Sequence, residues 1–254
     1  MCFFSLLTAT FNNGELLASN IESVIGQSFN HLEHIIIDGG SSDNTVELLK
    51  KYEQRYLMRW ISEPDDGIAD ALNKGIRIAK GKYVLVLQAD DALAMSETLK
   101  SVFDKINNSQ QDICSFPVLV DHKTRGRALH RPIRHIWYNR FRLIFPHQGC
   151  FVRRNVFDRI GGFNTEFKIS MDYDFFYRAL KHKCSVEFFD RPVSIMGGNG
   201  LSSVVDNFPQ RLKEDQLVQA INEDNKFWKI TQKLFWTLYV PYKNWQMKKA
   251  SVNS

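Results

Sequence analysis

Two adjacent acids, Asp90 and Asp91, follow a strongly apolar run that begins at Tyr83, directly after Gly81 and Lys82. Neighbouring carboxylates repel each other unless a cation lies between or beside them. Magnesium and manganese suit such a pair, because they prefer oxygen ligands and combine one or two carboxylates with phosphate oxygens and water. The pair therefore predicts a divalent metal site, and a solvated acidic turn that caps a helix at Ser96 is the alternative.

Polar residues also follow two other apolar runs. The first run ends in the polar stretch 8–13, and the second ends at Asp38, directly before two glycines. Ligands of open α/β sheets gather beyond the carboxyl ends of the strands, where Asp38 could accept hydrogen bonds from a base or a ribose. An ordinary turn followed by a helix N-cap explains Asp38 and its glycines equally well.

Asp172 shares one face of a predicted helix with apolar residues. Within residues 171–183, Asp172, Phe175, Phe176 and Ala179 follow the spacing i, i+3, i+4, i+7, so this carboxylate faces inward. A helix N-terminus favours an ionised carboxylate by about 0.3–1 kcal/mol, which suits a residue that must accept a proton. Asp172 is therefore a candidate general base, and an acid that only stabilises the helix dipole is the alternative.

Alternating apolar runs and helical patterns must position these groups. We expect four strands, at residues 2–9, 33–38, 57–62 and 82–88, and three helices between them, at 16–27, 41–52 and 67–79. This order predicts an α/β fold with a parallel, doubly wound sheet. Beyond it we expect strands at 112–120 and 184–195, a turn at 121–127, and helices at 93–108, 171–183 and 208–226.

Composition excludes several classes of protein. The 254 residues are 44% apolar and 24% charged, which are globular values, and the formal net charge of +5 does not indicate nucleic-acid binding. The four cysteines have neither zinc-site nor disulfide-framework spacing, which favours a reducing cytosol. The N-terminal run lacks a basic lead-in and a cleavage site, so we expect no signal peptide, and no apolar stretch predicts a transmembrane helix.

The C-terminal segment combines basic and aromatic residues. From Lys226 to Lys249 there are six lysines and no acid, with aromatic side chains interleaved. This mixture suits an anionic membrane interface, although a helix packed on the domain or an oligomer contact is an equal alternative. Pro241 is expected to interrupt any single long helix here.

Six segments follow one another as in the family-2 glycosyltransferases of the GT-A fold, namely TATFNN, IIIDGGSSDNT, SEPDDGIADALNKGI, GKYVLVLQADD, HQGCFVRRNVFDRIGGFN and MDYDFFYRAL. The chain most resembles the bacterial members that build O-antigen, capsule or exopolysaccharide. The resemblance implies a GT-A domain at 1–205, with a nucleotide-sugar-binding half at 1–110 and an acceptor and catalytic half at 111–205. A helical tail follows at 206–254, and membrane association is one expected role for it.

The resemblance also implies a nucleotide-diphosphate sugar donor, usually a uridine one. Asp38 is expected to contact the base, Asp90 to lie near the ribose, and Asp91 to coordinate the metal on the diphosphate. Further donor-binding residues are expected near the ends of the first and third strands and on the helix at 67–79, namely Thr8, Thr10, Asn12, Asp65 and Lys74. For Lys74, a surface pair with Asp70 is an equal alternative.

The chain departs from the family pattern in two places. Gln88 stands where many members have an acid or Asn, so Asp91 could be the metal's one protein carboxylate. Met171–Asp172 replaces a common Glu-Asp pair, which leaves Asp172 as the general base.

Acceptor-side and gating residues are expected in two further segments. His147, Gln148 and Arg153 belong near the acceptor, although a packed histidine and a solvated arginine are alternatives. Gly197, Gly198 and Ser202 could form a gate, although a plain glycine-rich turn is equally consistent.

The resemblance thus implies an inverting, metal-dependent glycosyltransferase that uses Mn²⁺ or Mg²⁺. Its expected acceptor is a sugar linked to polyprenyl diphosphate, and its expected location is peripheral, on the cytosolic face of the inner membrane. A nicotinamide-dependent oxidoreductase is excluded, because the first strand lacks a following G-x-G-x-x-G. The remaining rival is a non-catalytic sugar-nucleotide-binding or scaffold protein of the same fold.

Overall fold

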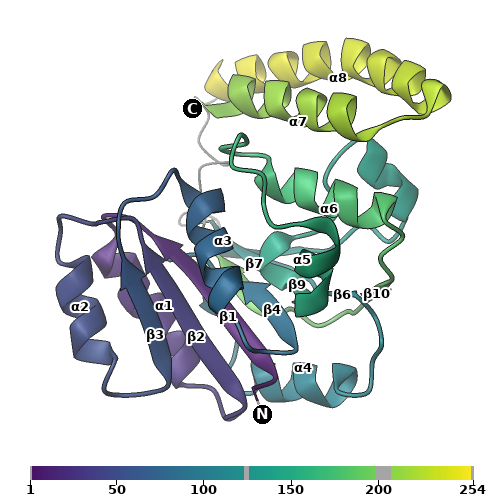
Figure 1. Cartoon of the computed structure of the whole chain (residues 1–254). Helices are drawn as coiled ribbons and strands as arrows, with labels where there is room; N and C mark the ends of the chain where they lie inside the picture. Colours follow the sequence, from purple (N-terminus) through teal and green to yellow (C-terminus); the bar gives the residue numbers. More distant parts are fainter. Residues whose placement is uncertain (1, 123–125, 198–206, 253–254) are drawn as a thin grey trace.

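A computed structural model describes residues 2–122, 126–197 and 207–252, and its main element is a seven-stranded sheet (Figure 1). The strand order is β10-β6-β9-β4-β1-β2-β3. The strands are β1 (Phe4–Thr10), β2 (Leu32–Asp38), β3 (Met58–Ser62), β4 (Tyr83–Val86), β6 (Ile113–Ser115), β9 (Cys150–Arg153) and β10 (Val186–Phe188). Strands β1 to β4 are parallel, whereas β9 runs antiparallel to both β4 and β6. The predicted doubly wound, mostly parallel α/β sheet is confirmed.

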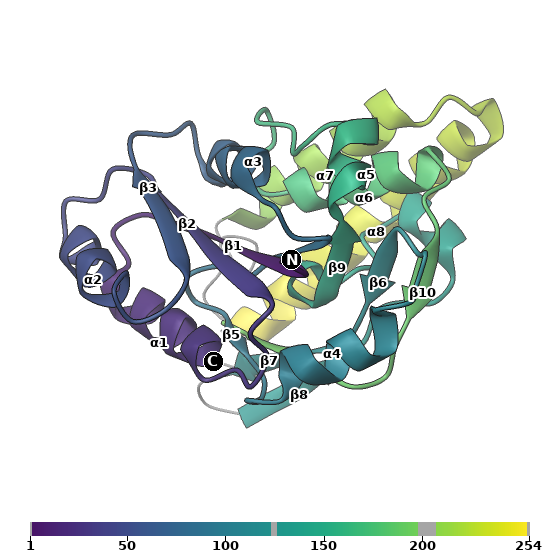
Figure 2. The same cartoon turned by 60° about the horizontal axis from the view of Figure 1, so that its bottom comes forward.

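Helices cover both faces of this sheet (Figures 1 and 2). One face carries α1 (Gly14–Ile25), α2 (Thr45–Tyr52) and α4 (Thr98–Ile106), and the other carries α3 (Ile68–Ile78), α5 (Arg154–Ile160) and α6 (Met171–Lys181). Successive side chains of a strand point to opposite faces. Leu7 therefore packs in the cluster that includes α3 and α6, while its neighbour Leu6 packs in the cluster that includes α4. Burial on both faces explains why these strands read as continuous apolar runs.

Two predicted strands are each divided between two sheets. A second sheet has the order β5-β11-β7-β8, with β5 (Ala92–Leu93), β11 (Ser194–Met196), β7 (Val118–His122) and β8 (Gly126–His130). The predicted strand at 112–120 becomes β6 and β7, and the one at 184–195 becomes β10 and β11. Pro117 and Pro192 lie between the halves, and proline lacks the N–H that a central strand must donate. The chain leaves one sheet at each proline and enters the other.

The C-terminal residues form two helices, α7 (Phe208–Asn222) and α8 (Lys226–Val252), stacked over α6 (Figure 1). The expected interruption at Pro241 is wrong, because α8 continues through this residue. The proline ring is exposed to solvent, and the helix loses one backbone hydrogen bond there while one side of it packs against α7. None of the described helices is both long and apolar enough to cross a bilayer.

Candidate active site

A cavity of about 490 Å³ lies beyond the carboxyl ends of β1 and β4. The strand order reverses between these two neighbours, so this is the switch point at which α/β sheets bind ligands. Residues after both strands line the cavity, together with residues from the start of α6 and the end of β11. The topology thus brings together two of the three polar strand ends that the sequence analysis singled out, namely those after β1 and β4.

Four carboxylates converge on this cavity, namely Asp65, Asp90, Asp91 and Asp172. Among its described lining residues, Lys168 carries the one ammonium group. The structure therefore places Asp90, Asp91 and Asp172 in one site, as the sequence predicted, although the first two lie far from the third along the chain. Without a further cation, the walls carry an excess of negative charge.

Asp91 is the most deeply buried of these acids, with 1% of its surface exposed. Its Oδ2 accepts a hydrogen bond from the backbone N–H of Gln88 at 2.9 Å, and its Oδ1 accepts one from Gly197 at 3.1 Å. Burial, with the nearby charge of Asp90, raises the pKa of Asp91 to about 8. Its carboxylate is held in a fixed orientation but lacks a compensating positive charge.

Asp90 and Gly197 lie in very close contact. A Cβ atom at position 197 would lie 2.5 Å from Oδ2 of Asp90 and 2.7 Å from its carbonyl oxygen. Glycine is therefore required for β11 to approach the acidic pair. Burial also raises the pKa of Asp90 above its usual value.

Asp172 occupies the first turn of α6, where its Oδ1 accepts a hydrogen bond from the Tyr173 N–H at 2.7 Å. Burial raises the pKa of Asp172 to about 6, and the positive charge of Arg211 on α7 opposes this shift. The carboxylate therefore ionises near neutrality, in the range that suits a general base.

Helix α7 holds the segment that precedes Asp172, and no sequence pattern predicted this contact. Oε2 of Glu214 accepts hydrogen bonds from the backbone N–H groups of Ile169 at 2.8 Å and Ser170 at 2.9 Å. The Ser170 hydroxyl donates to Asp215 at 2.7 Å. Glu214 thus satisfies free N–H groups at the start of α6 from a distant part of the chain.

Lys168 is a second residue that the sequence did not single out. Its Nζ donates to the carbonyl oxygen of Asp66 at 2.5 Å, which joins the loop before α6 to the loop before α3. Because Lys168 lines the cavity, its ammonium group is available to an anionic ligand there. No local motif marks it, since an isolated lysine before a helix is an ordinary surface residue.

The two threonines of β1 differ in their surroundings. Thr10 lines the cavity, is 6% exposed, and its buried hydroxyl has no hydrogen-bond partner. The hydroxyl of Thr8 instead donates to the carbonyl oxygen of Leu87 at 2.6 Å, and Thr8 does not line the cavity. Of the two, Thr10 is the candidate for donor binding, because a buried polar group without a partner is costly unless a ligand satisfies it.

Asp38 and Asn12 organise the loop after β2. Both carboxylate oxygens of Asp38 accept hydrogen bonds, from Ser41 and from the Ser62 hydroxyl, the latter at 2.6 Å. The Asn12 side chain accepts the Ser42 N–H at 2.8 Å. Neither residue lines the cavity, so a contact with a base would require Asp38 to exchange one of these partners.

Two predicted site residues lie elsewhere. Nζ of Lys74 bonds to Glu63 and to the Pro64 carbonyl oxygen, each at 2.9 Å, and Lys74 does not line the cavity. Arg153 pairs with Tyr83 at the opposite edge of the sheet, because antiparallel β9 carries the chain away from the cavity. The structure therefore does not support the predicted donor-side position of Lys74 or the acceptor-side position of Arg153.

The remaining acceptor and gate predictions divide in the same way. His147, Gln148 and Gly197 line the cavity, whereas Gly198 and Ser202 lie outside the described residues. Burial lowers the pKa of His147 to about 4, so its ring is neutral, and it packs 5.4 Å from the Phe163 ring. His147 is thus a packed histidine on the cavity wall.

The acidic pair fits a divalent cation. Within the described residues, no three His, Cys, Asp or Glu side chains form a complete metal centre. Two adjacent carboxylates, the buried Asp91 and the partly buried Asp90, have no matching positive charge, and this suits a magnesium or manganese ion whose other ligands are phosphate oxygens and water. The donor set suits a metal that arrives with a diphosphate.

Comparison with known proteins agrees with this geometry. Residues 5–178 match the family described as "Glycosyl transferase family 2". The chain is 29% identical over 192 residues to a "PGL/p-HBAD biosynthesis glycosyltransferase" of Mycobacterium bovis, and the match covers 72% of each protein.

Solved structures show the same fold. S. aureus TarS 1-349 in complex with UDP-GlcNAc superposes with a TM-score of 0.69 and 19% identity, over 88% of this chain and 68% of that one. Against the longer TarS chain, the match spans 40% of its length. The mannosyltransferase PcManGT from Pyrobaculum calidifontis, in complex with GDP-Man and Mn²⁺, superposes with a TM-score of 0.60 and 16% identity, over 97% of this chain and 84% of that one.

Proposed function

The chain belongs to glycosyl transferase family 2 and has the GT-A fold, and we propose that it transfers a sugar from a uridine-diphosphate donor to a glycan acceptor with inversion at the anomeric carbon. One observation carries this proposal. Asp90 and Asp91 from the end of β4, and Asp172 from the start of α6, line one cavity at the switch point of the sheet. A metal-binding pair and a single separate carboxylate are the two parts that such a transfer needs.

The donor is proposed to be a nucleotide-diphosphate sugar, with hexose or N-acetylhexosamine as the sugar. Complexes of TarS with UDP-GlcNAc and of PcManGT with GDP-Man support this class of ligand. In this chain, the unpartnered hydroxyl of Thr10 offers a hydrogen bond to the nucleotide, and Asp65 and Lys168 border the same space. Lys168 would face the anionic diphosphate.

Asp91, with Asp90 beside it, would hold Mn²⁺ or Mg²⁺ together with the donor diphosphate. When bound, such an ion offsets the charge that grows on the leaving diphosphate. The two backbone N–H groups that hold the Asp91 carboxylate fix its orientation before any ligand arrives. Preorganisation of this kind removes a cost that would otherwise be met during the reaction.

Asp172 is the proposed general base. Its carboxylate would accept the proton of an acceptor hydroxyl while the hydroxyl oxygen attacks the anomeric carbon. The bond from that carbon to the diphosphate oxygen breaks as the new glycosidic bond forms, and its electron pair leaves with the diphosphate. One displacement inverts the centre and needs no covalent intermediate.

The proposed acceptor is a sugar linked to polyprenyl diphosphate, used in bacterial surface polysaccharide assembly on the cytosolic face of the membrane. The resemblance of the motifs to surface-polysaccharide enzymes supports this class of acceptor.

Nucleotide release tests the proposal against a non-catalytic sugar-nucleotide-binding protein of the same fold. The purified protein is incubated with Mn²⁺, a panel of nucleotide sugars and a synthetic lipid-diphosphate-linked sugar. A transferase releases free UDP only when a matched donor and acceptor are both present. Binding of UDP-sugar without acceptor-dependent release across the panel would favour the binding protein.

A further inference from the structure

Helix α8 presents an exposed apolar face. Its members are 50–75% exposed, namely Phe227, Ile230, Leu234, Leu238, Tyr242 and Trp245. They recur every three or four residues, so they form one stripe along the helix, called here the apolar face of α8. Soluble monomers rarely expose a contiguous apolar surface of this kind without a binding partner.

The opposite side of α8 is anchored to the domain. The Trp236 indole N–H donates to Oε1 of Gln219 on α7 at 2.7 Å. Nε2 of Gln232 donates to the carbonyl oxygen of Arg140 at 2.8 Å, and the ring of Phe235 lies 5.4 Å from that of Phe141. These contacts fix which side of α8 faces outward.

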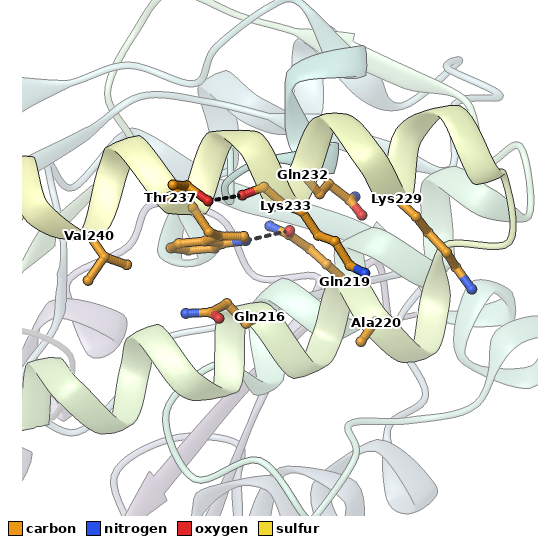
Figure 3. Close-up of a pocket in the computed structure, with 9 residues that line it drawn as sticks. Gln216, Gln219, Ala220, Lys229, Gln232, Lys233, Thr237 and Val240 are labelled. Atoms are coloured by element: carbon orange, nitrogen blue, oxygen red, sulfur yellow. Dashed lines mark hydrogen bonds between the residues drawn. The ribbon is translucent and has the colours of Figure 1, made fainter.

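Positive charge borders the apolar face of α8. Lys226, Lys229 and Lys233 recur three or four residues apart beside the stripe, and Asp224, the acid next to the start of this helix, forms its salt bridge with Lys181 at 2.6 Å. Lys229 and Lys233 also line a groove of about 860 Å³ between α7 and α8, which has no acid among its described lining residues (Figure 3). The sequence contains no Asp or Glu from residue 225 to its end.

We propose that α8 lies flat on an anionic membrane, with its apolar face in the boundary between headgroups and acyl chains and its lysines among the lipid phosphates. An exposed apolar stripe bordered by lysine is typical of helices that lie in this interface. A second copy of the chain is a poorer occupant, because a two-fold interface would bring the same lysines of both copies together without any acid to pair them.

This placement would bring the membrane close to the proposed base. Gln219, which accepts the Trp236 hydrogen bond, donates through Nε2 to the Tyr173 hydroxyl at 2.9 Å. Tyr173 is the residue next to Asp172 on α6. Two hydrogen bonds therefore tie the membrane-facing helix to the helix that carries the base. The inference deepens the proposed lipid-linked acceptor but does not require it.

Vesicle flotation of the full chain tests the inference, with vesicles of phosphatidylcholine alone or mixed with phosphatidylglycerol. We expect binding that requires the anionic lipid and weakens with salt. The double variant Leu234→Asn/Leu238→Asn should bind at least about tenfold more weakly, because it removes apolar surface from the stripe. The matched control Leu57→Asn/Leu129→Asn changes two exposed leucines elsewhere and should bind like wild type.

Lysine variants test the electrostatic part. Lys229→Gln/Lys233→Gln should weaken binding and flatten its salt dependence, whereas Lys50→Gln/Lys105→Gln should do neither, because those exposed lysines lie far from α8 in the sequence and on other helices.

Equal flotation of wild type and Leu234→Asn/Leu238→Asn would overturn the inference. A dimer in solution that the same leucine variant dissociates, without flotation, would assign the face to a second copy. Flotation needs neither donor nor acceptor, so its failure is distinct from a failure of UDP release with a soluble acceptor.

Discussion

Asp91 and Asp172 line the same cavity from two different elements. Asp91 lies in the loop after β4, and Asp172 lies in the first turn of α6. Their surroundings differ. Asp91 has a second acid beside it and two backbone N–H donors, whereas Asp172 has one N–H donor and the positive charge of Arg211, which lowers its pKa. The first arrangement calls for a cation, and the second suits a carboxylate that exchanges a proton near neutral pH.

The pKa of Asp172 predicts how rate depends on pH. A general base must be ionised, and burial raises its pKa to about 6 in the free protein. Measured as kcat/KM, which reports the free enzyme, activity should fall about tenfold per pH unit below about pH 6. A profile that stays flat down to about pH 4.5 would remove Asp172 from this role.

The same shift predicts that Asp172→Asn stabilises the fold. The folded pKa lies above the ordinary value of 3.8, so ionisation opposes folding above about pH 6, and this cost disappears as the pH falls below 3.8. The variant should therefore gain up to about 3 kcal/mol in free energy of unfolding at alkaline pH and nothing under acidic conditions. Urea unfolding at both pH values checks this, and a destabilised variant at alkaline pH would contradict it.

Thr8 and Thr10 offer a matched pair. Thr10→Val removes a hydroxyl without a partner in the protein, so stability should be unchanged while UDP binds about tenfold more weakly. Thr8→Val breaks a buried hydrogen bond to Leu87 and should lower the free energy of unfolding by about 1–3 kcal/mol. Calorimetric UDP titration and thermal unfolding separate the two. Equal UDP affinity of Thr10→Val and wild type would exclude a donor contact.

Gly197→Ala should reduce activity at least about tenfold, because its Cβ would lie 2.5 Å from Oδ2 of Asp90 and would displace the acidic pair. Gly26→Ala serves as the control, since its Cβ meets only the Glu22 carbonyl oxygen, at 3.3 Å. Steady-state rates at saturating donor make the comparison. Full activity of Gly197→Ala would show that the approach of β11 is not needed.

Glu214 is proposed as a positioning residue for Asp172. Glu214→Ala should lower kcat about tenfold or more and leave UDP affinity unchanged, because it frees the segment before α6 without touching the acidic pair. Glu214→Gln should restore most of kcat, since its amide oxygen can still accept both N–H groups. A parallel loss of UDP binding, or no rescue by glutamine, would indicate a general structural defect.

Local sequence patterns predicted a site residue where its position depends on a single helix or strand. Helical spacing placed Asp172 on an inward face with Phe175, and continuous apolar runs placed Asp91 at a buried strand end. The predicted position of Arg153 near the acceptor is wrong because the sequence pattern does not reveal β9. This short antiparallel strand runs away from the cavity, so His147 lies at the cavity and Arg153 lies beside the start of β4. The contact of Glu214 with Ser170 could not be predicted from local sequence patterns, because it joins segments that come together only in the folded chain.

The most direct test of the account is acceptor-dependent UDP release by Asp172→Asn, at a donor concentration that saturates both variant and wild type in the presence of Mn²⁺. If Asp172 is the base, the rate should fall by a factor of about 100 or more with UDP affinity retained, whereas Asp91→Asn should lose Mn²⁺-dependent UDP binding itself. Turnover by Asp172→Asn within a few-fold of wild type would contradict the account.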